Sequence, residues 1–180
     1  MKRILILSIV ILSSSLTSPL FAQDNDFIKE YLERLENSRK YLILVAETMP
    51  EENYGFKATP ESMSFAENLM HIAWAMDWHS LSLMGGRVAR DWNTDTELKA
   101  DKKSKKEMIA AINKTFDKTT AFISNFDIDK LEERLDYFGL DRTKRQVLLL
   151  LADHITHHRG QMLVYMRLNG LKPPRYVLYQ

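Results

Sequence analysis

One helix-start signal stands at the head of three apolar, periodic stretches of this chain, and it constrains the fold more than any other feature. It is the capping box, in which a Ser or Thr precedes a Glu or Gln by three residues. The hydroxyl accepts a hydrogen bond from the third N–H of the helix, and the acidic or amide side chain reaches back to the N–H of the cap. The pairs at the head of such stretches are Ser64 with Glu67, Ser104 with Glu107, and Thr143 with Gln146. They predict three helices with defined first turns.

Apolar residues recur at helical spacing in four stretches, which adds a fourth helix before the three capped ones. The predicted helices span residues 27–49, 64–84, 104–126 and 143–168. Their ends coincide with Pro50, with the Gly85-Gly86 pair, with a fading stripe at Phe126 and with Gly170. No stretch reads convincingly as a strand. We therefore predict an all-α fold, an antiparallel four-helix bundle with long connections after helices 1 and 3.

The first 22 residues have the composition of a cleavable secretory signal peptide. Lys2 and Arg3 precede an apolar run over residues 4–12, a Ser-rich stretch and the small residue Ala22. The run is far shorter than the roughly 20 apolar residues that a membrane-spanning helix needs. We expect cleavage after Ala22, a mature bundle domain over residues 23–180 without a membrane anchor, and a periplasmic or secreted location.

Charge and cysteine content exclude several classes of function. The chain has 25 Lys and Arg against 24 Asp and Glu, and removal of the two basic residues of the leader leaves a domain close to neutral. Such a surface gives no electrostatic reason to expect a nucleic acid as partner. The absence of cysteine excludes disulfides, a catalytic thiolate and Cys-type zinc sites.

Three of the five histidines fall in the sequence HITHHRGQ, as His154, His157 and His158. On a helix, His154 and His158 lie about 40° apart, with their Cβ atoms roughly 5–6 Å from each other. Two imidazoles so placed can bind one metal ion, and a hydrogen-bonded pair of core histidines is the alternative. The zinc-protease signature is excluded because Ile155 stands where its glutamate would be. We expect His157 and Arg159 on the helix surface, the arginine solvated or paired with an acid.

A third metal ligand would come from the second helix, where periodicity does not choose between His71 and His79. Both lie in a sector of small and polar residues that contains no Lys or Arg, with Glu67 at its edge. Two interpretations of this sector stay open. It lines a cleft flanked by Trp74 and Trp78, or it is a lightly polar surface.

The stretches MPEENYGFKATPESMSFAENLMHIA and LLADHITHHRGQMLVYMRLNGLKPP resemble the DinB-like superfamily, also called the DinB/YfiT-like metal-binding proteins. The resemblance extends from about Phe27 to Pro174. It implies a four-helix bundle with a divalent metal site that is open to water or substrate, and the ligands carried over by position are His71, His154 and His158. Zinc is the first expectation for the metal, with nickel or iron as alternatives. The resemblance also implies a homodimer that forms through helix faces. The sequence itself neither supports nor excludes this dimer.

The function expected from this resemblance is a metal-dependent hydrolase that uses a metal-bound water on a small-molecule substrate. Alternatives are a non-catalytic bundle that binds a metal or small ligand, and a metal-dependent thiol transferase, which an exported location disfavours. No catalytic residue is assigned, because Gln161 and Tyr165 are unsuited to act as a base at neutral pH and Glu67 is expected to complete its cap. If His79 or Asp77 provided a fourth ligand, the site would be structural.

Overall fold

The computed structural model describes the backbone of residues 18–176 and the side chains from Asp26 onward. Residues 1–17 of the predicted signal peptide lie outside this range. The elements are α2 (Ser18–Thr48), α3 (Phe65–Met76), a π-helix (Asp77–Met84), α4 (Lys105–Ser124), β1 (Arg134–Tyr137), β2 (Leu140–Thr143) and α5 (Lys144–Leu168), with 3-10 turns at Glu51–Asn53 and Ile128–Lys130. Within the described residues, no helix is both long enough and apolar enough to span a membrane.

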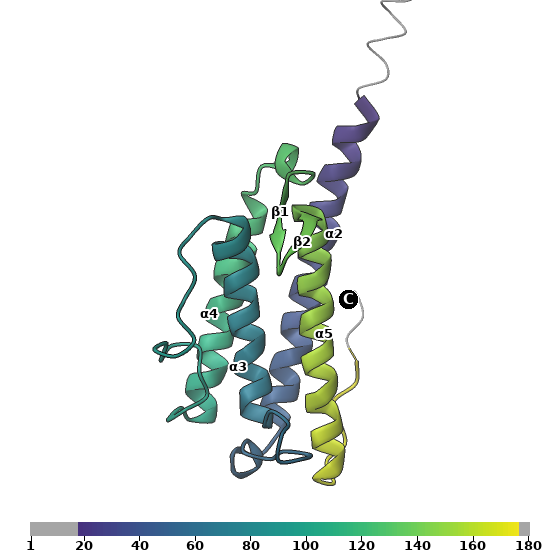
Figure 1. Cartoon of the computed structure of the whole chain (residues 1–180). Coiled ribbons are helices and arrows are strands. Elements are labelled where there is room, and N and C mark those ends of the chain that lie inside the picture. Colours follow the sequence, from purple (N-terminus) through teal and green to yellow (C-terminus); the bar gives the residue numbers. More distant parts are fainter. Residues whose placement is uncertain (1–17, 177–180) are drawn as a thin grey trace, which may run out of the picture.

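The predicted four-helix bundle is confirmed, and its helices lie side by side in Figure 1. Each helix contributes an apolar stripe to one core, which accounts for the 3.6-residue period of the sequence. Examples of fully buried side chains from the four helices are Leu42, Phe65, Phe116 and Leu148. Burial of such side chains contributes about 25 cal/mol per Å² of apolar surface, so the core is the main source of stability.

All three predicted capping boxes form, and they fix the first turns of α3, α4 and α5. In the first of them, the Glu67 N–H donates to the Ser64 hydroxyl over 3.1 Å, and the Ser64 N–H donates to Oε2 of Glu67 over 2.6 Å. Each cap satisfies two backbone donors that a helix start otherwise leaves unpaired. The start of each of these three helices is thereby fixed by local hydrogen bonds.

The connection over residues 85–104 runs back along the bundle (Figure 1) and makes α3 and α4 parallel, so the bundle is not antiparallel throughout as predicted. The C-terminal ends of the second and third helices of the bundle lie together: Ser80 Oγ is 3.3 Å from Thr119 Oγ1, and Gly85 packs beside Phe122. The sequence predicted long connections after helices 1 and 3, and the connection after helix 2 is long too. α3 and α5 run in opposite directions, as the hydrogen bond between Asn68 near the start of α3 and His158 in the second half of α5 indicates. The two histidine-bearing helices therefore face each other.

The second predicted helix reaches Met84, but its last eight residues form a π-helix. A π-helix holds more residues per turn than an α-helix, so side chains after Asp77 leave the angular register of α3. Gly86 has a φ of +73°, and this left-handed residue ends the helix as predicted.

The connection between α4 and α5 contains a short antiparallel hairpin, so the prediction of no strand was wrong. β1 pairs with β2 from Arg134 opposite Thr143 to Tyr137 opposite Leu140. Phe138 and Gly139 form the tip with φ values of +54° and +79°, the conformation of a tight two-residue hairpin turn. Strands of four residues, half of them exposed, are too short to show a clear alternating pattern in the sequence.

Candidate metal centre

His71 from α3 and His154 and His158 from α5 come together between the two helices. One ring nitrogen of each lies within 4.8 Å of the others. Their ring centroids are separated by 4.6 Å for His71 and His158, 4.6 Å for His154 and His158, and 5.0 Å for His71 and His154. The structure thus brings together the three residues that the family resemblance selected, and it places His71, not His79, in the cluster.

The polar sector of the second helix is buried, so the alternative of a lightly polar surface was wrong. Asn68, Ala75 and His79 have relative exposures of 0%, 4% and 3%. The sector lacks Lys and Arg because it packs toward α5 and the hairpin, where a charged side chain would have to lose its hydration. Trp74 and Trp78 are half-buried at its flank.

Asn68 fixes the protonated nitrogen of His158. The Asn68 amide group donates to the carbonyl oxygens of Met63 and Ser64, over 3.1 and 2.9 Å, which leaves Oδ1 as its acceptor. Nδ1 of His158 lies 2.8 Å from that oxygen and must therefore carry the proton. The lone pair of His158 is consequently on Nε2, the arrangement that a metal-binding imidazole requires.

All three imidazoles of the cluster are held neutral. Burial, reinforced by the neighbouring His71, lowers the pKa of His154 to about 4 and that of His158 to about 3. Burial also lowers the pKa of His71. Nδ1 of His71 and Nε2 of His154 are buried without a hydrogen-bond partner, although buried polar atoms are usually satisfied. Neutral imidazoles with unused nitrogens fit a divalent ion, since a metal binds only the deprotonated nitrogen.

Neither of the two residues considered for a fourth ligand belongs to the cluster. Nδ1 of His79 donates to the carbonyl oxygen of Ala75 over 2.7 Å, so Nε2 accepts from the Tyr137 hydroxyl at 2.9 Å. Asp77 is buried and forms ion pairs with Arg87 and Arg90. Among the described residues, the group of metal-binding side chains that lie this close together therefore has three members.

The remaining polar side chains near the cluster have other partners. Nε2 of Gln161 lies 2.8 Å from Nε2 of His157, which is exposed as predicted. The Tyr165 hydroxyl donates to the carbonyl oxygen of Met63 over 3.0 Å. Glu67 completes its cap and forms an ion pair with Lys57 at 3.1 Å. The expectation that Glu67 serves as a cap is confirmed.

Arg159 was predicted on the surface, and this was wrong, because it is only 4% exposed. Its guanidinium carbon lies 5.3 Å from the ring centre of Tyr41 and 5.7 Å from that of Tyr176, within the range of cation–π contacts. Tyr176 belongs to the segment after α5, which turns back toward α2, and the Tyr41 hydroxyl donates to the carbonyl oxygen of Pro174. The sequence of α5 alone does not reveal this covering segment.

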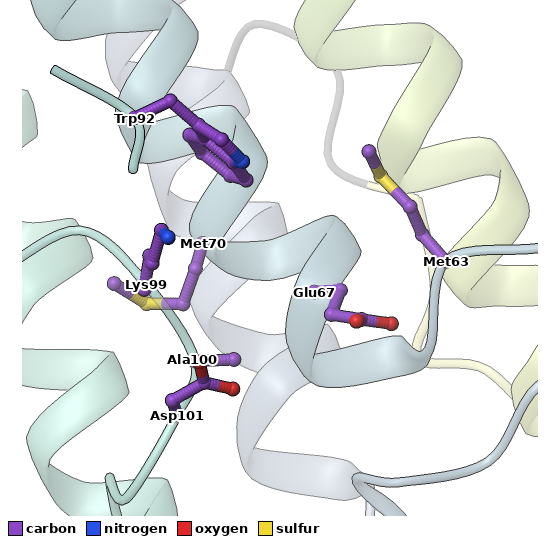
Figure 2. A pocket seen from close by; sticks show the side chains of 7 residues that line it. All are labelled: Met63, Glu67, Met70, Trp92, Lys99, Ala100 and Asp101. Atoms are coloured by element: carbon purple, nitrogen blue, oxygen red, sulfur yellow. The ribbon is translucent and has the colours of Figure 1, made fainter. Parts of the chain in front are cut away.

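A pocket of about 230 Å³ (Figure 2) has Trp92 in its wall, a side chain that also packs against His71 of the cluster. It is lined by Met63, Glu67, Met70, Trp92, Lys99, Ala100 and Asp101. Trp92, from the connection after the π-helix, packs edge-on against Trp74 at 4.7 Å and against His71 at 6.1 Å. The single Trp in this otherwise polar connection was the one signal in the sequence that it contacts the site.

The first prediction concerns the hydrogen bond from Asn68 to His158. Replacing Asn68 with Leu removes the acceptor for Nδ1 of His158, which frees the imidazole to change tautomer and rotate. Loss of such an outer partner weakens metal binding by about 10-fold to 100-fold, and we expect a loss in this range in a zinc competition titration. Asn68→Asp keeps an acceptor for His158 and should recover most of the affinity. Equal affinities of the wild type and Asn68→Leu would contradict this role.

The second prediction concerns the pH dependence of the metal-free fold. The pKa of His158 is about 3 in the folded chain and about 6.5 in an unfolded one, so the unfolded state takes up more protons below pH 6.5. Stability therefore falls as the pH is lowered from 7 to 5. Urea unfolding with a chelator present should show a smaller fall for His158→Asn, whose amide can still donate to Asn68. Identical falls in both proteins would contradict the pKa assignment.

Comparisons with known proteins agree on one family. A model of the DinB family matches residues 22–179. The uncharacterized protein YjoA of Bacillus subtilis is 26% identical over 152 residues, which cover 82% of this chain and 92% of YjoA. The YjoA crystal structure has a TM-score of 0.68 at 24% identity and covers 84% of this chain and 99% of that one. A DinB-like protein from Bacillus cereus ATCC 10987 has a TM-score of 0.61 at 26% identity, covering 83% and 94%. These matches confirm the predicted resemblance.

Proposed function

The chain belongs to the DinB family, and on that premise we propose that His71, His154 and His158 bind one divalent ion, zinc first, at which a small molecule is hydrolysed. The observation that carries the proposal is a cluster of three neutral imidazoles without a fourth protein ligand among the described residues. Structural zinc sites are closed by four protein ligands, whereas catalytic sites keep one position for water or substrate. When bound, such an ion polarises a substrate oxygen and lowers the pKa of a coordinated water.

The chain's own residues support this chemistry by holding and shielding the site. Asn68 keeps the proton of His158 on Nδ1, and burial keeps His154 neutral. Trp92 packs edge-on against His71 and against Trp74, and an aromatic ring on the imidazole lowers the local dielectric and strengthens electrostatic interactions there. The pocket that shares Trp92 would hold a small substrate near His71.

The test of the proposed function is hydrolysis that depends on the metal. Residues 23–180 are prepared with zinc, stripped with a chelator and reloaded, and each form is assayed on a panel of carboxylic and phosphoric esters. We expect turnover that disappears on stripping and returns on reloading. His157→Ala, which changes an exposed histidine on the same helix, should keep full activity. No turnover in the zinc-loaded form, or equal turnover in the stripped form, would contradict the proposal.

We further propose that the domain acts outside the cytoplasm, because the leader has the composition of a signal peptide. Expression of the full chain in a bacterium followed by fractionation should place the protein in the periplasm or medium. Its N-terminus should then be Gln23. Recovery of the uncut chain in the cytoplasm would contradict this.

A further inference from the structure

Lys99 is the cation of the pocket beside the histidine cluster. Its Nζ lies over the ring of Trp92, 5.2 Å from the centroid, and it forms no ion pair with any described residue. This sets it apart from Arg90 and Lys114, which in the same part of the structure bind Glu97. Lys99 is half-buried and lines the pocket. A partly desolvated ammonium group without an anionic partner favours an anionic ligand.

The charge of the metal-bound histidine cluster also favours an anionic ligand. Three neutral histidines leave the full charge of a divalent ion uncompensated, because the group contains no Asp or Glu. Lys99 would add a second positive centre at the far side of Trp92. Building on the proposed function, we propose that the site is specific for substrates that carry a carboxylate, which Lys99 binds while the bond to be hydrolysed lies at the histidines.

Lys99 and His71 both contact Trp92, which places the proposed carboxylate site and the histidine cluster around one side chain. Trp92 links them, since its ring lies 5.2 Å from Nζ of Lys99 and its centroid 6.1 Å from that of His71. The pocket wall also includes the side chains of Met70, next to Lys99, and of Met63, on the other side of Glu67 (Figure 2). A flexible methylene chain suits such a wall, because thioether side chains adapt to apolar ligands. The expected substrate therefore has an apolar middle and an anionic end.

Two carboxylates also line the pocket, and neither removes the preference for an anion. The charge of Glu67 is compensated by Lys57 and by the N–H of Ser64. Asp101 is exposed, so solvent screens its repulsion. The substitution Asp101→Asn should therefore strengthen the binding of an anionic probe slightly.

The test uses two hydroxamic acids that differ only at the far end. Hexanohydroxamic acid ends in a methyl group, and the monohydroxamic acid of adipic acid ends in a carboxylate; the hydroxamate of each is the metal-binding group. With zinc-loaded protein at low salt, calorimetry should show at least tenfold tighter binding of the carboxylate-ended probe. Lys99→Met keeps the apolar stem of the side chain and should reduce the ratio to below twofold. Lys106→Met, at an exposed lysine of α4 outside the pocket, should leave the ratio unchanged.

A second measurement needs no metal. Hexanoate added to the chelator-treated protein should shift the indole N–H signal of Trp92 in an NMR spectrum, and Lys99→Met should abolish the shift. If zinc and both hydroxamates fail to bind, the proposed function is wrong, and this hexanoate experiment alone decides the role of Lys99. If both hydroxamates bind equally, or if the preference survives in Lys99→Met, the carboxylate proposal is wrong while the metal site stands.

Discussion

Replacing His154 with alanine should abolish stoichiometric zinc binding. The imidazole supplies one of three ligands, and its Nε2 is buried without another partner. Two remaining histidines form a poor divalent site, so the affinity should fall by more than the roughly 10–100-fold that follows from losing an outer partner. Metal analysis after gel filtration should find about one zinc per wild-type chain and none in the variant.

The matched control for this experiment is His157→Ala. His157 lies on the same helix between the two ligands but is exposed, so its removal should leave one zinc per chain. The metal-free His154→Ala protein should unfold at a similar urea concentration to the wild type, because no hydrogen bond to His154 is lost. Retention of zinc by His154→Ala, or loss of zinc by both variants, would refute the assignment of this ligand.

Replacing Asp77 with Ala should lower the free energy of unfolding strongly while the protein still binds the metal. The carboxylate is buried and receives ion pairs from Arg87 and Arg90, which anchor the connection after the π-helix. Truncating one member of a buried ion pair costs about 3–5 kcal/mol, and we expect about 3 kcal/mol because both arginines are partly exposed. Urea unfolding of the metal-free proteins measures this loss.

An exposed ion pair provides the comparison for Asp77. Asp117 binds Arg39 at 2.7 Å on the surface, and pairs of this kind contribute at most about 1 kcal/mol. Asp117→Asn should therefore change the free energy of unfolding little. Both variants should still bind one zinc per chain. Loss of zinc in Asp77→Ala while the fold is intact would show that Asp77 serves the metal site, against our interpretation.

Helix signals in this sequence are local, and the structure follows them closely. The capping boxes at Ser64, Ser104 and Thr143 each form within four residues of chain, so no distant contact was needed to predict them. The hairpin and the π-helix depend on tertiary packing. Tyr137 reaches His79 across 58 positions of sequence, and a contact of this kind leaves no periodic pattern.

The metal cluster was only partly accessible from sequence. The four-residue spacing of His154 and His158 predicts that they are neighbours on one helix face, and the structure confirms it. The choice of His71 needed the family resemblance, because the helical period places His71 and His79 in the same sector. The role of Asn68 was missed, since an asparagine three residues from a histidine is common in helices and its partner lies 90 positions away.

The central claim is that the three histidines bind one divalent ion at an open site, and anomalous diffraction from zinc-soaked crystals tests it most directly. The account predicts one peak at about 2.0–2.1 Å from a ring nitrogen of each of His71, His154 and His158, with solvent as the remaining ligand. A crystal without zinc at this cluster, or with His79 as a fourth protein ligand, would contradict it.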